Sequence, residues 1–295
     1  MKIINKIIVI IIAVVGLYAA FLIASDIGTV YDQIINFKIE FLLVIIPLVI
    51  TGWFVLFARW HLLLKNSKIF IPKKDSLLIF FSSFALAIIP GKVGELIKSQ
   101  LLKTKFEVPR SKTVPIVMLE QFYTLIGLVI ISFFGIWFFE LGAYVIGFFT
   151  ALLIFAFILI SSKKVFNKLI TIFEKRKFTS RFVEPLSSSY DIIKKTTRGR
   201  ITFYATALTV IFWFIEAVVV YLVLLSFGIE NIEFLKVIPT YATSLMLGFL
   251  SFLPMGLGVV EGSLASFFSL QALNPLNSKA MLKAFIYFPF LYNYS

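Results

Sequence analysis

The chain has 295 residues, of which 60% are hydrophobic and 17% aromatic, and it carries a formal net charge of +13. A mean hydropathy of +1.00 exceeds what a soluble core of this length needs, so the composition predicts a polytopic membrane protein. The chain has no cysteine and one histidine, His61, which excludes disulfides and thiolate metal sites and argues against a histidine metal site. We expect no metal and no other cofactor.

Hydrophobic runs predict the membrane segments, because a helix needs about 20 apolar residues to cross a bilayer. The first run is longer than the apolar region of a signal peptide, so we expect it to be retained as a helix. Two shorter runs, 77–89 and 241–253, do not reach across and lead into proline and glycine. The candidate spans, in chain order, are 7–24, 41–58, 114–139, 142–161, 201–227 and 277–293.

Charge assigns the connections to sides, because lysine and arginine accumulate in cytoplasmic loops. The loop 162–200 contains eleven basic residues and three acidic ones, and the segments 65–76 and 98–112 are also basic. The connections 25–40 and 228–237 are acidic. We therefore expect a multi-pass protein of the cell membrane with the N-terminus and the loop 162–200 in the cytoplasm. Because the basic residues are distributed as expected for the cytoplasmic connections of a membrane protein, the net charge does not indicate nucleic-acid binding.

Two breaks interrupt the apolar runs with proline, glycine and a carboxylate: Pro90-Gly91-Lys92-Val93-Gly94-Glu95 and Pro254-Met255-Gly256-Leu257-Gly258-Val259-Val260-Glu261. Both flanks of 77–97 are basic and are expected on the cytoplasmic side, and by the same accounting 238–272 enters and leaves from the outside. Each stretch is thus predicted to enter and leave by the same face as a re-entrant hairpin, with irregular backbone only where protein or a wet cavity covers it. The alternative is a pair of ordinary tilted spans whose glycines serve close packing.

The two halves of the chain repeat this order of elements. Residues 1–140 read as span, span, hairpin and span, and residues 141–295 read the same way in the opposite orientation. The fold class is therefore an all-α polytopic membrane protein with about six spanning helices plus two re-entrant helical hairpins, or about eight transmembrane segments. It forms a single membrane domain, 1–295, with an inverted-topology repeat, a design that secondary transporters use to place a site at the midplane.

The first break is predicted to bind an anionic lipid headgroup. Glycine permits a tight turn, and a half-helix beginning near Val93 aims free N–H groups and a positive dipole end at a ligand. Lys92 and Lys98 add positive charge. The alternative is that these lysines are interfacial cations paired with Glu95 at a three-residue spacing.

Glu216 lies inside the span 201–227, where an unpaired acid costs about 2.5–3.5 kcal/mol on insertion scales. Glu120 lies about two turns into its span, and Glu261 closes the second break. These acids suggest proton coupling or contact with a headgroup amine or hydroxyl; the alternative is a protonated carboxyl bonded to a neighbouring helix. The full predicted headgroup site comprises Pro90, Gly91, Lys92, Gly94, Glu95, Lys98, Glu120, Glu216, Pro254, Gly256, Gly258 and Glu261.

Two further groups of residues are assigned to the membrane interface. Arg59, Trp60 and His61 end the second span and are expected to anchor it by snorkelling. In the basic loop, Phe166, Leu169, Ile170 and Phe173 recur at helical spacing opposite lysines. This pattern predicts an amphipathic helix on the anionic inner leaflet.

Four motifs in order, Pro-Gly-Lys-Val-Gly-Glu-Leu-Ile-Lys (90–98), Leu-Glu-Gln (119–121), Trp-Phe-Ile-Glu (213–216) and Leu-Pro-Met-Gly-Leu-Gly-Val-Val-Glu (253–261), resemble the flippase-like family that includes the membrane region of lysylphosphatidylglycerol synthases. The resemblance covers nearly the whole chain and implies a lipid translocase without the soluble aminoacyl-transferase domain. The chain departs from the family at Gln121, Thr124 and Phe288, where the family tends to carry charged residues.

Three functions are compatible with these observations. The first is a translocase that moves or binds an anionic or polyprenyl-type polar-headed lipid. The second is a membrane-embedded transferase acting on lipid-linked glycans or phospholipids, although no catalytic constellation is evident. The third is an assembly partner of a lipid-modifying enzyme.

Overall fold

The computed structural model describes residues 37–86, 94–134, 140–174, 190, 194, 199–251, 253 and 256–272. Every regular element within these residues is a helix, which confirms the all-α class. The predicted spans at 7–24 and 277–293 lie outside the described residues.

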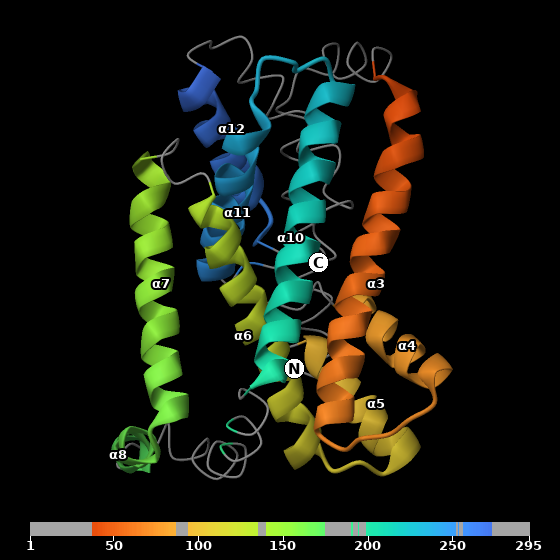
Figure 1. Cartoon of the computed structure of the whole chain (residues 1–295), viewed down its shortest axis with the longest axis vertical. Coiled ribbons are helices and arrows are strands. Elements are labelled where there is room, and N and C mark those ends of the chain that lie inside the picture. The colour runs from red at the N-terminus through yellow and green to blue at the C-terminus, as the bar shows by residue number, and fades with distance from the viewer. Residues whose placement is uncertain are drawn as a thin grey trace, which may run out of the picture.

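Four long helices correspond to four of the predicted spans. They are α3 (Leu42–Asn66), which follows the 3-10 turn η1 (Ile39–Phe41), α6 (Arg110–Phe133), α7 (Glu140–Ser161) and α10 (Arg200–Ser226). Three of the described segments, α3 with η1, α6 and α10, are long and apolar enough to cross a membrane. The long helices run along the long axis of the molecule (Figure 1). The chain is therefore membrane-embedded.

The helix α10 contacts both α3 and α6. Glycines permit the close approach on both sides. A Cβ atom on Gly52 of α3 would lie 3.3 Å from the ring of Phe212, and one on Gly127 of α6 would lie 2.5 Å from the Thr209 methyl group. These two glycines therefore set the distance between the long helices.

The start of η1 is tied to the end of α10. The backbone N–H of Lys38 donates to the carbonyl of Ser226 at 3.0 Å, and the Lys38 ammonium donates to the Glu230 carboxylate at 2.9 Å. This hydrogen bond and the lysine charge lower the pKa of the exposed Glu230 carboxyl. The contacts align the two long helices at this end of the molecule.

Two pairs of shorter helices flank the breaks. The helix α4 (Lys73–Ser82), the 3-10 turn η2 (Phe84–Leu86) and the helix α5 (Ile97–Phe106) occupy the lower part of Figure 1, and α11 (Phe234–Leu250) and α12 (Val259–Ala272) occupy the upper part. An ion pair between Asp75 and Lys105 joins the outer ends of α4 and α5. The two breaks thus lie between helix pairs at opposite ends, while the re-entrant interpretation stays a prediction.

Two predicted loops are shorter in the structure than in the sequence interpretation. The segment 98–112 was expected to be a basic loop, but α5 extends through Phe106 because Lys98, Ser99 and Leu102 form a buried face behind its exposed lysines. The acidic loop 228–237 ends early because α11 begins at Phe234. Pro239 obscures that start in the sequence, although the structure accommodates it within the helix.

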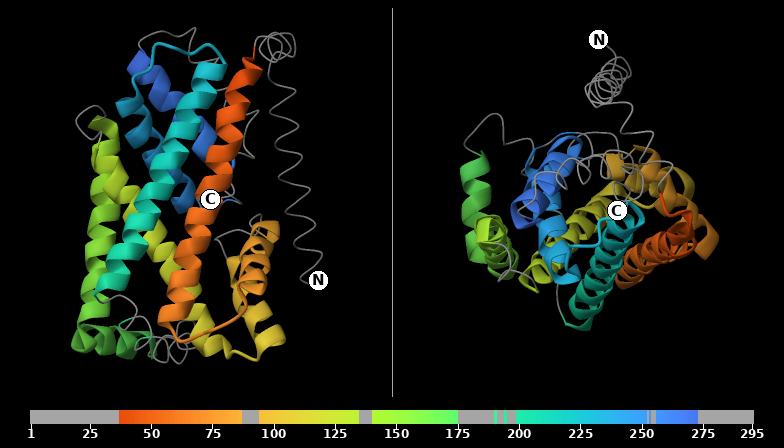
Figure 2. Two further views of the ribbon diagram at one scale, coloured as in Figure 1. Left: turned by 45° about the vertical axis from the view of Figure 1, so that its right-hand side comes forward. Right: turned by 90° about the horizontal axis from the view of Figure 1, so that it is seen from above.

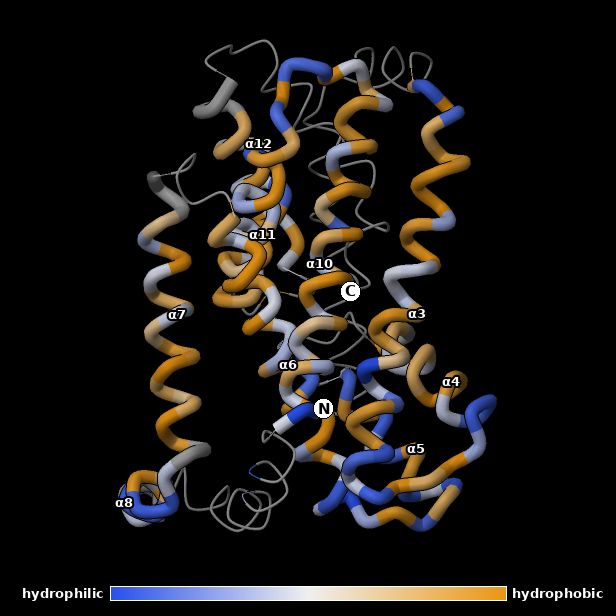
Figure 3. The backbone as a smooth tube through the Cα atoms, in the orientation of Figure 1, coloured by the Kyte–Doolittle hydropathy of each residue, from blue (hydrophilic) through white to orange (hydrophobic). Residues whose placement is uncertain are grey.

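The helix α8 (Lys163–Glu174) lies across the end of α7 (Figure 2). Lys163, Lys164 and Lys168 are exposed, whereas the Phe166 ring lies 4.3 Å from the Tyr190 ring. Figure 3 shows hydrophilic and hydrophobic residues sharing this one helix, in contrast to the apolar α7. The amphipathic helix predicted from the basic loop is therefore confirmed.

Candidate functional site

The described half of the first break begins at Gly94, which lies against the end of η2. A Cβ atom at this position would overlap the backbone carbonyl of Leu86, so the approach of the two segments requires glycine. Gly94 begins a single 3-10 turn, and α5 follows at Ile97. The predicted site residues Pro90, Gly91 and Lys92 lie outside the described residues.

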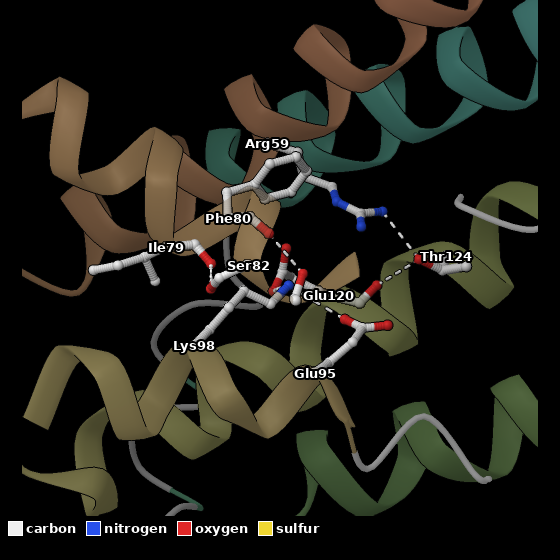
Figure 4. A network of polar contacts seen from close by, with 9 residues as sticks. Arg59, Ile79, Phe80, Ser82, Glu95, Lys98, Glu120 and Thr124 are labelled. Atoms are coloured by element: carbon white, nitrogen blue, oxygen red, sulfur yellow. Dashed lines mark hydrogen bonds and ion pairs between the residues drawn. The ribbon is translucent and has the colours of Figure 1, made fainter. Parts of the chain in front are cut away.

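A buried ion-pair cluster lies directly behind this turn. The Lys98 ammonium donates to the Glu120 carboxylate at 2.8 Å and to the Glu95 carboxylate at 3.2 Å (Figure 4). The side chains of Lys98 and Glu120 are 3% and 1% exposed, whereas that of Glu95 is 21% exposed. The aromatic rings of Trp60 and Phe80 cover Lys98, with their centroids 5.1 and 5.5 Å from the ammonium nitrogen.

This cluster shows the surroundings of Lys98. The sequence placed its charge in a basic loop and assigned it to an anionic headgroup, but two carboxylates balance that charge inside the protein. The alternative pairing with Glu95 is confirmed, and Glu120 is a second partner. Headgroup binding by Lys98 stays a prediction.

Arg59 is the functional candidate that the sequence interpretation missed. It was expected to snorkel at the interface, yet it is 4% exposed within α3, which continues to Asn66. Its guanidinium donates to the hydroxyls of Thr124 at 3.2 Å and Thr209 at 2.9 Å. Among the described residues, its Nε atom has no hydrogen-bond partner. The sequence does contain an indication of this burial, because the leucines 62–64 extend the apolar run beyond the arginine.

Arg59 and the ion-pair cluster are neighbours across α6. Thr124, which accepts from Arg59, donates to the backbone carbonyl of Glu120 at 2.8 Å, one helical turn away. Within the described residues, Arg59 forms no ion pair. Two cations and two carboxylates from separate parts of the chain therefore lie close to one another, and among the described residues the arginine hydrogen-bonds to neutral hydroxyls.

Glu216 belongs to a different polar group, between α10 and α11. It is 1% exposed, and one of its oxygens accepts a long hydrogen bond of 3.4 Å from the phenol of Tyr241. A Cβ atom on Gly52 of α3 would lie 3.5 Å from the other oxygen. Glu216 therefore faces protein, between α3 and α11.

The second break is built around a helix cap. Gly258 has a φ of +81° and precedes α12, and its N–H donates to the Glu261 carboxylate at 2.6 Å. An acid at the third helical position that accepts from the N-cap N–H is half of a capping box. Gly256 has a φ of +70°, and a Cβ atom on it would lie 2.9 Å from the Cα atom of Gly248. Pro254 lies outside the described residues.

The predicted site residues thus fall into three local groups. Glu95, Lys98 and Glu120 lie together behind the first break, Glu216 lies at the α10–α11 contact, and Glu261 caps α12. No group of three histidine, cysteine or acidic residues suited to a metal ion occurs in the part of the chain that the structure describes. The chemistry available in these groups is ion pairing, hydrogen bonding and proton exchange.

Comparison with known proteins places the chain in a family. No curated protein matches it in sequence. The family model described as "Lysylphosphatidylglycerol synthase TM region" matches residues 7–289, which include all four motifs and all three polar groups. This coverage extends over nearly the whole chain and agrees with the helical, membrane-embedded structure. The chain therefore belongs to the family of lysylphosphatidylglycerol synthase transmembrane regions.

Proposed function

We propose that the protein is a lipid translocase that receives the phosphate of a polar-headed lipid at Arg59. The observation that carries this proposal is the buried guanidinium, which bonds only to neutral hydroxyls among the described residues. A buried cation is costly in a membrane interior and marks a substrate or ion pathway by default. An anionic phosphate supplies the charge and acceptor oxygens that a guanidinium fork matches.

The neighbouring ion-pair cluster gives the headgroup a polar route to this arginine. Glu95 is partly exposed, whereas Lys98 and Glu120 are deeply buried. A headgroup that enters past Glu95 meets alternating charges instead of hydrocarbon. Because these charges balance, the cluster favours a polar lipid without trapping an anion, which a transporter must also release.

The short helices support a re-entrant arrangement around the first break. The helices α4 and α5 have 10 residues each and so extend about 15 Å, roughly half of the hydrocarbon thickness of about 30 Å. In this proposal their inner ends meet near the midplane, and α11 with α12 forms the inverted counterpart from the other side. The basic end with α5 and α8 faces the cytoplasm of a cell membrane, since lysines accumulate there.

Reconstitution into liposomes with a fluorescent phospholipid tests the proposal. A membrane-impermeant quencher reports the fraction of lipid that has crossed between leaflets. We expect the protein to accelerate exchange, and Arg59→Gln to reduce the rate about 10- to 100-fold, because a hydrogen bond to a charged group contributes about 1.5–3 kcal/mol. Arg110→Gln, an exposed arginine at the start of α6, is the matched control.

Two results would contradict the proposal. One is leaflet exchange no faster than in protein-free liposomes. The other is an altered headgroup in the recovered lipids, detected by mass spectrometry, which would indicate a transferase.

A further inference from the structure

The contact between α10 and α11 contains a carboxyl group that the headgroup site does not use. Glu216 lies well inside α10 and is 1% exposed. Among the described residues, its hydrogen bond comes from the phenol of Tyr241 on α11, and it forms no ion pair. A carboxylate with one long hydrogen bond and no cation is poorly stabilised in an apolar interior.

The other helices around α10 bring no compensating charge into contact with this carboxyl. From α3, Gly52 is the neighbour of Glu216, and Arg59 lies two turns further along and bonds Thr124 and Thr209. The buried part of α6 contributes Glu120, paired with Lys98, and Tyr123, which donates to Thr202. Arg110 and Lys112, at the start of α6, are exposed. Lys236 of α11 pairs with Glu233, and Glu40 of η1 is exposed.

A direct hydrogen bond holds α10 to α6, whereas on the α11 side the described hydrogen bond from α10 is the one that Glu216 accepts. The indole of Trp213 donates to the backbone carbonyl of Thr124 at 3.1 Å, which holds α10 to α6. One turn further along α10, Glu216 accepts from Tyr241 of α11, whose ring packs edge to face against the Trp213 ring with centroids 6.3 Å apart. One turn along α11 from Tyr241, the Ser244 hydroxyl is buried with no partner among the described residues. Water entering there would find polar groups to bond.

We infer that Glu216 is a proton-binding site that links the packing of α10 against α11 to pH. With the proton bound, the neutral carboxyl fits the closed interface. When the proton passes to water, the carboxylate requires hydration, and α11 separates from α10 to admit it. Opening is therefore coupled to release of one proton.

The coupling between proton release and opening extends to the second break through α11. The helix α11 ends at Leu250, and Gly248 packs against Gly256 and Val260 at the start of α12. A shift of α11 thus changes the support of the second break. The consequence for lipid movement rests on the proposed translocase function, whereas proton binding and opening do not.

Single-cysteine labelling tests the inference directly, because the chain has no cysteine of its own. We would substitute Ser244→Cys and measure its reaction with a water-soluble maleimide at a series of pH values. Asn231→Cys, in the exposed connection after α10, corrects for the intrinsic pH dependence of the thiol. While the closed form dominates, the corrected rate is expected to rise about tenfold per pH unit, because one proton is released on opening.

The Glu216→Gln variant decides the outcome. The amide cannot ionise, so the corrected Ser244→Cys rate is expected to stay low and constant with pH. An unchanged pH dependence in Glu216→Gln would overturn the inference, as would a corrected rate in the parent that does not vary with pH. Glu230→Gln, an exposed acid, is the control and should leave the pH dependence intact. Absence of lipid exchange with these labelling results intact would remove only the translocase.

Discussion

Lys98 shows how one side chain can contribute to opposite interpretations. Its position four residues after Gly94 and among other lysines suggests a cation exposed to a headgroup, while its burial places it between two carboxylates and two rings. Transferring an ammonium from water to such a site is costly unless carboxylates compensate it. The charges of the cluster therefore depend on one another, and the loss of one member leaves the buried charge of another without compensation.

This dependence predicts a large effect of removing the lysine. Lys98→Met leaves the buried Glu120 carboxylate without its cation, and we expect a loss of about 3–5 kcal/mol in unfolding free energy. Thermal and denaturant unfolding in detergent, followed by tryptophan fluorescence, would measure it. Adding Glu120→Gln to Lys98→Met should recover part of the loss, because the buried charge is then removed.

Lys105 supplies the comparison. It pairs with Asp75 at the surface, so Lys105→Met should cost about 1 kcal/mol or less. Equal destabilisation by the two lysine substitutions would show that burial does not increase the cost of removing the cation of an ion pair here.

The sequence predicted some site residues better than others for physical reasons. Glu120 and Glu216 stand alone in apolar runs, so their burial followed from helix length. Arg59 is next to Trp60 and His61, a combination that also suits an interface, and only its contacts with Thr124 and Thr209 reveal its depth. Those contacts join three separate helices, and no local pattern records them.

At the scale of the helix, length and apolar content determined most boundaries. The predicted spans 41–58, 142–161 and 201–227 correspond to α3, α7 and α10, although α3 runs eight residues beyond the predicted end. Arg59, Trp60 and His61 interrupt the apolar run at the start of that extension, and only the structure shows that Arg59 bonds Thr124 and Thr209 of other helices. The same limitation hid the first turns of α11, which contain Lys236 and Pro239.

The contact between α6 and α10 depends on the absence of a side chain at Gly127. Gly127→Ala would place a methyl group 2.5 Å from the Thr209 methyl and 2.9 Å from the Trp213 ring. Trp213 is held by its bond to Thr124, so the helices must separate. We expect a loss of about 1–3 kcal/mol, the range typical of overpacking, measured by thermal unfolding in detergent.

Gly147 of α7 is the matched control for this substitution. A Cβ atom there meets no atom within 4 Å, so Gly147→Ala should be neutral or should stabilise the helix by about 0.5–1 kcal/mol. Destabilisation by both variants to the same degree would assign the effect to helix glycines in general and not to the α6–α10 contact.

For the whole molecule, charge and helix direction together define two ends. The exposed lysines of α5 and α8 lie at the lower end of Figure 1, while the connection from α10 to α11, with Glu230 and Glu233, lies at the upper end. The directions of the helices place these basic and acidic groups at opposite ends of the molecule, independently of the rule that lysines accumulate in the cytoplasm. Because helix direction and charge asymmetry agree, we predict one orientation in the membrane, with the basic end in the cytoplasm.

This orientation predicts which positions a membrane-impermeant maleimide reaches in intact cells. Single cysteines at Lys103 of α5, Lys164 of α8 and Asn231 would be expressed in turn in the naturally cysteine-free chain. Positive charge is retained in the cytoplasm, so Asn231→Cys should react in intact cells, and Lys103→Cys and Lys164→Cys only after permeabilisation. Reaction of Lys103→Cys together with Asn231→Cys in intact cells would place α5 on the outer side, and the first helix pair could then not be a hairpin entering from the cytoplasm.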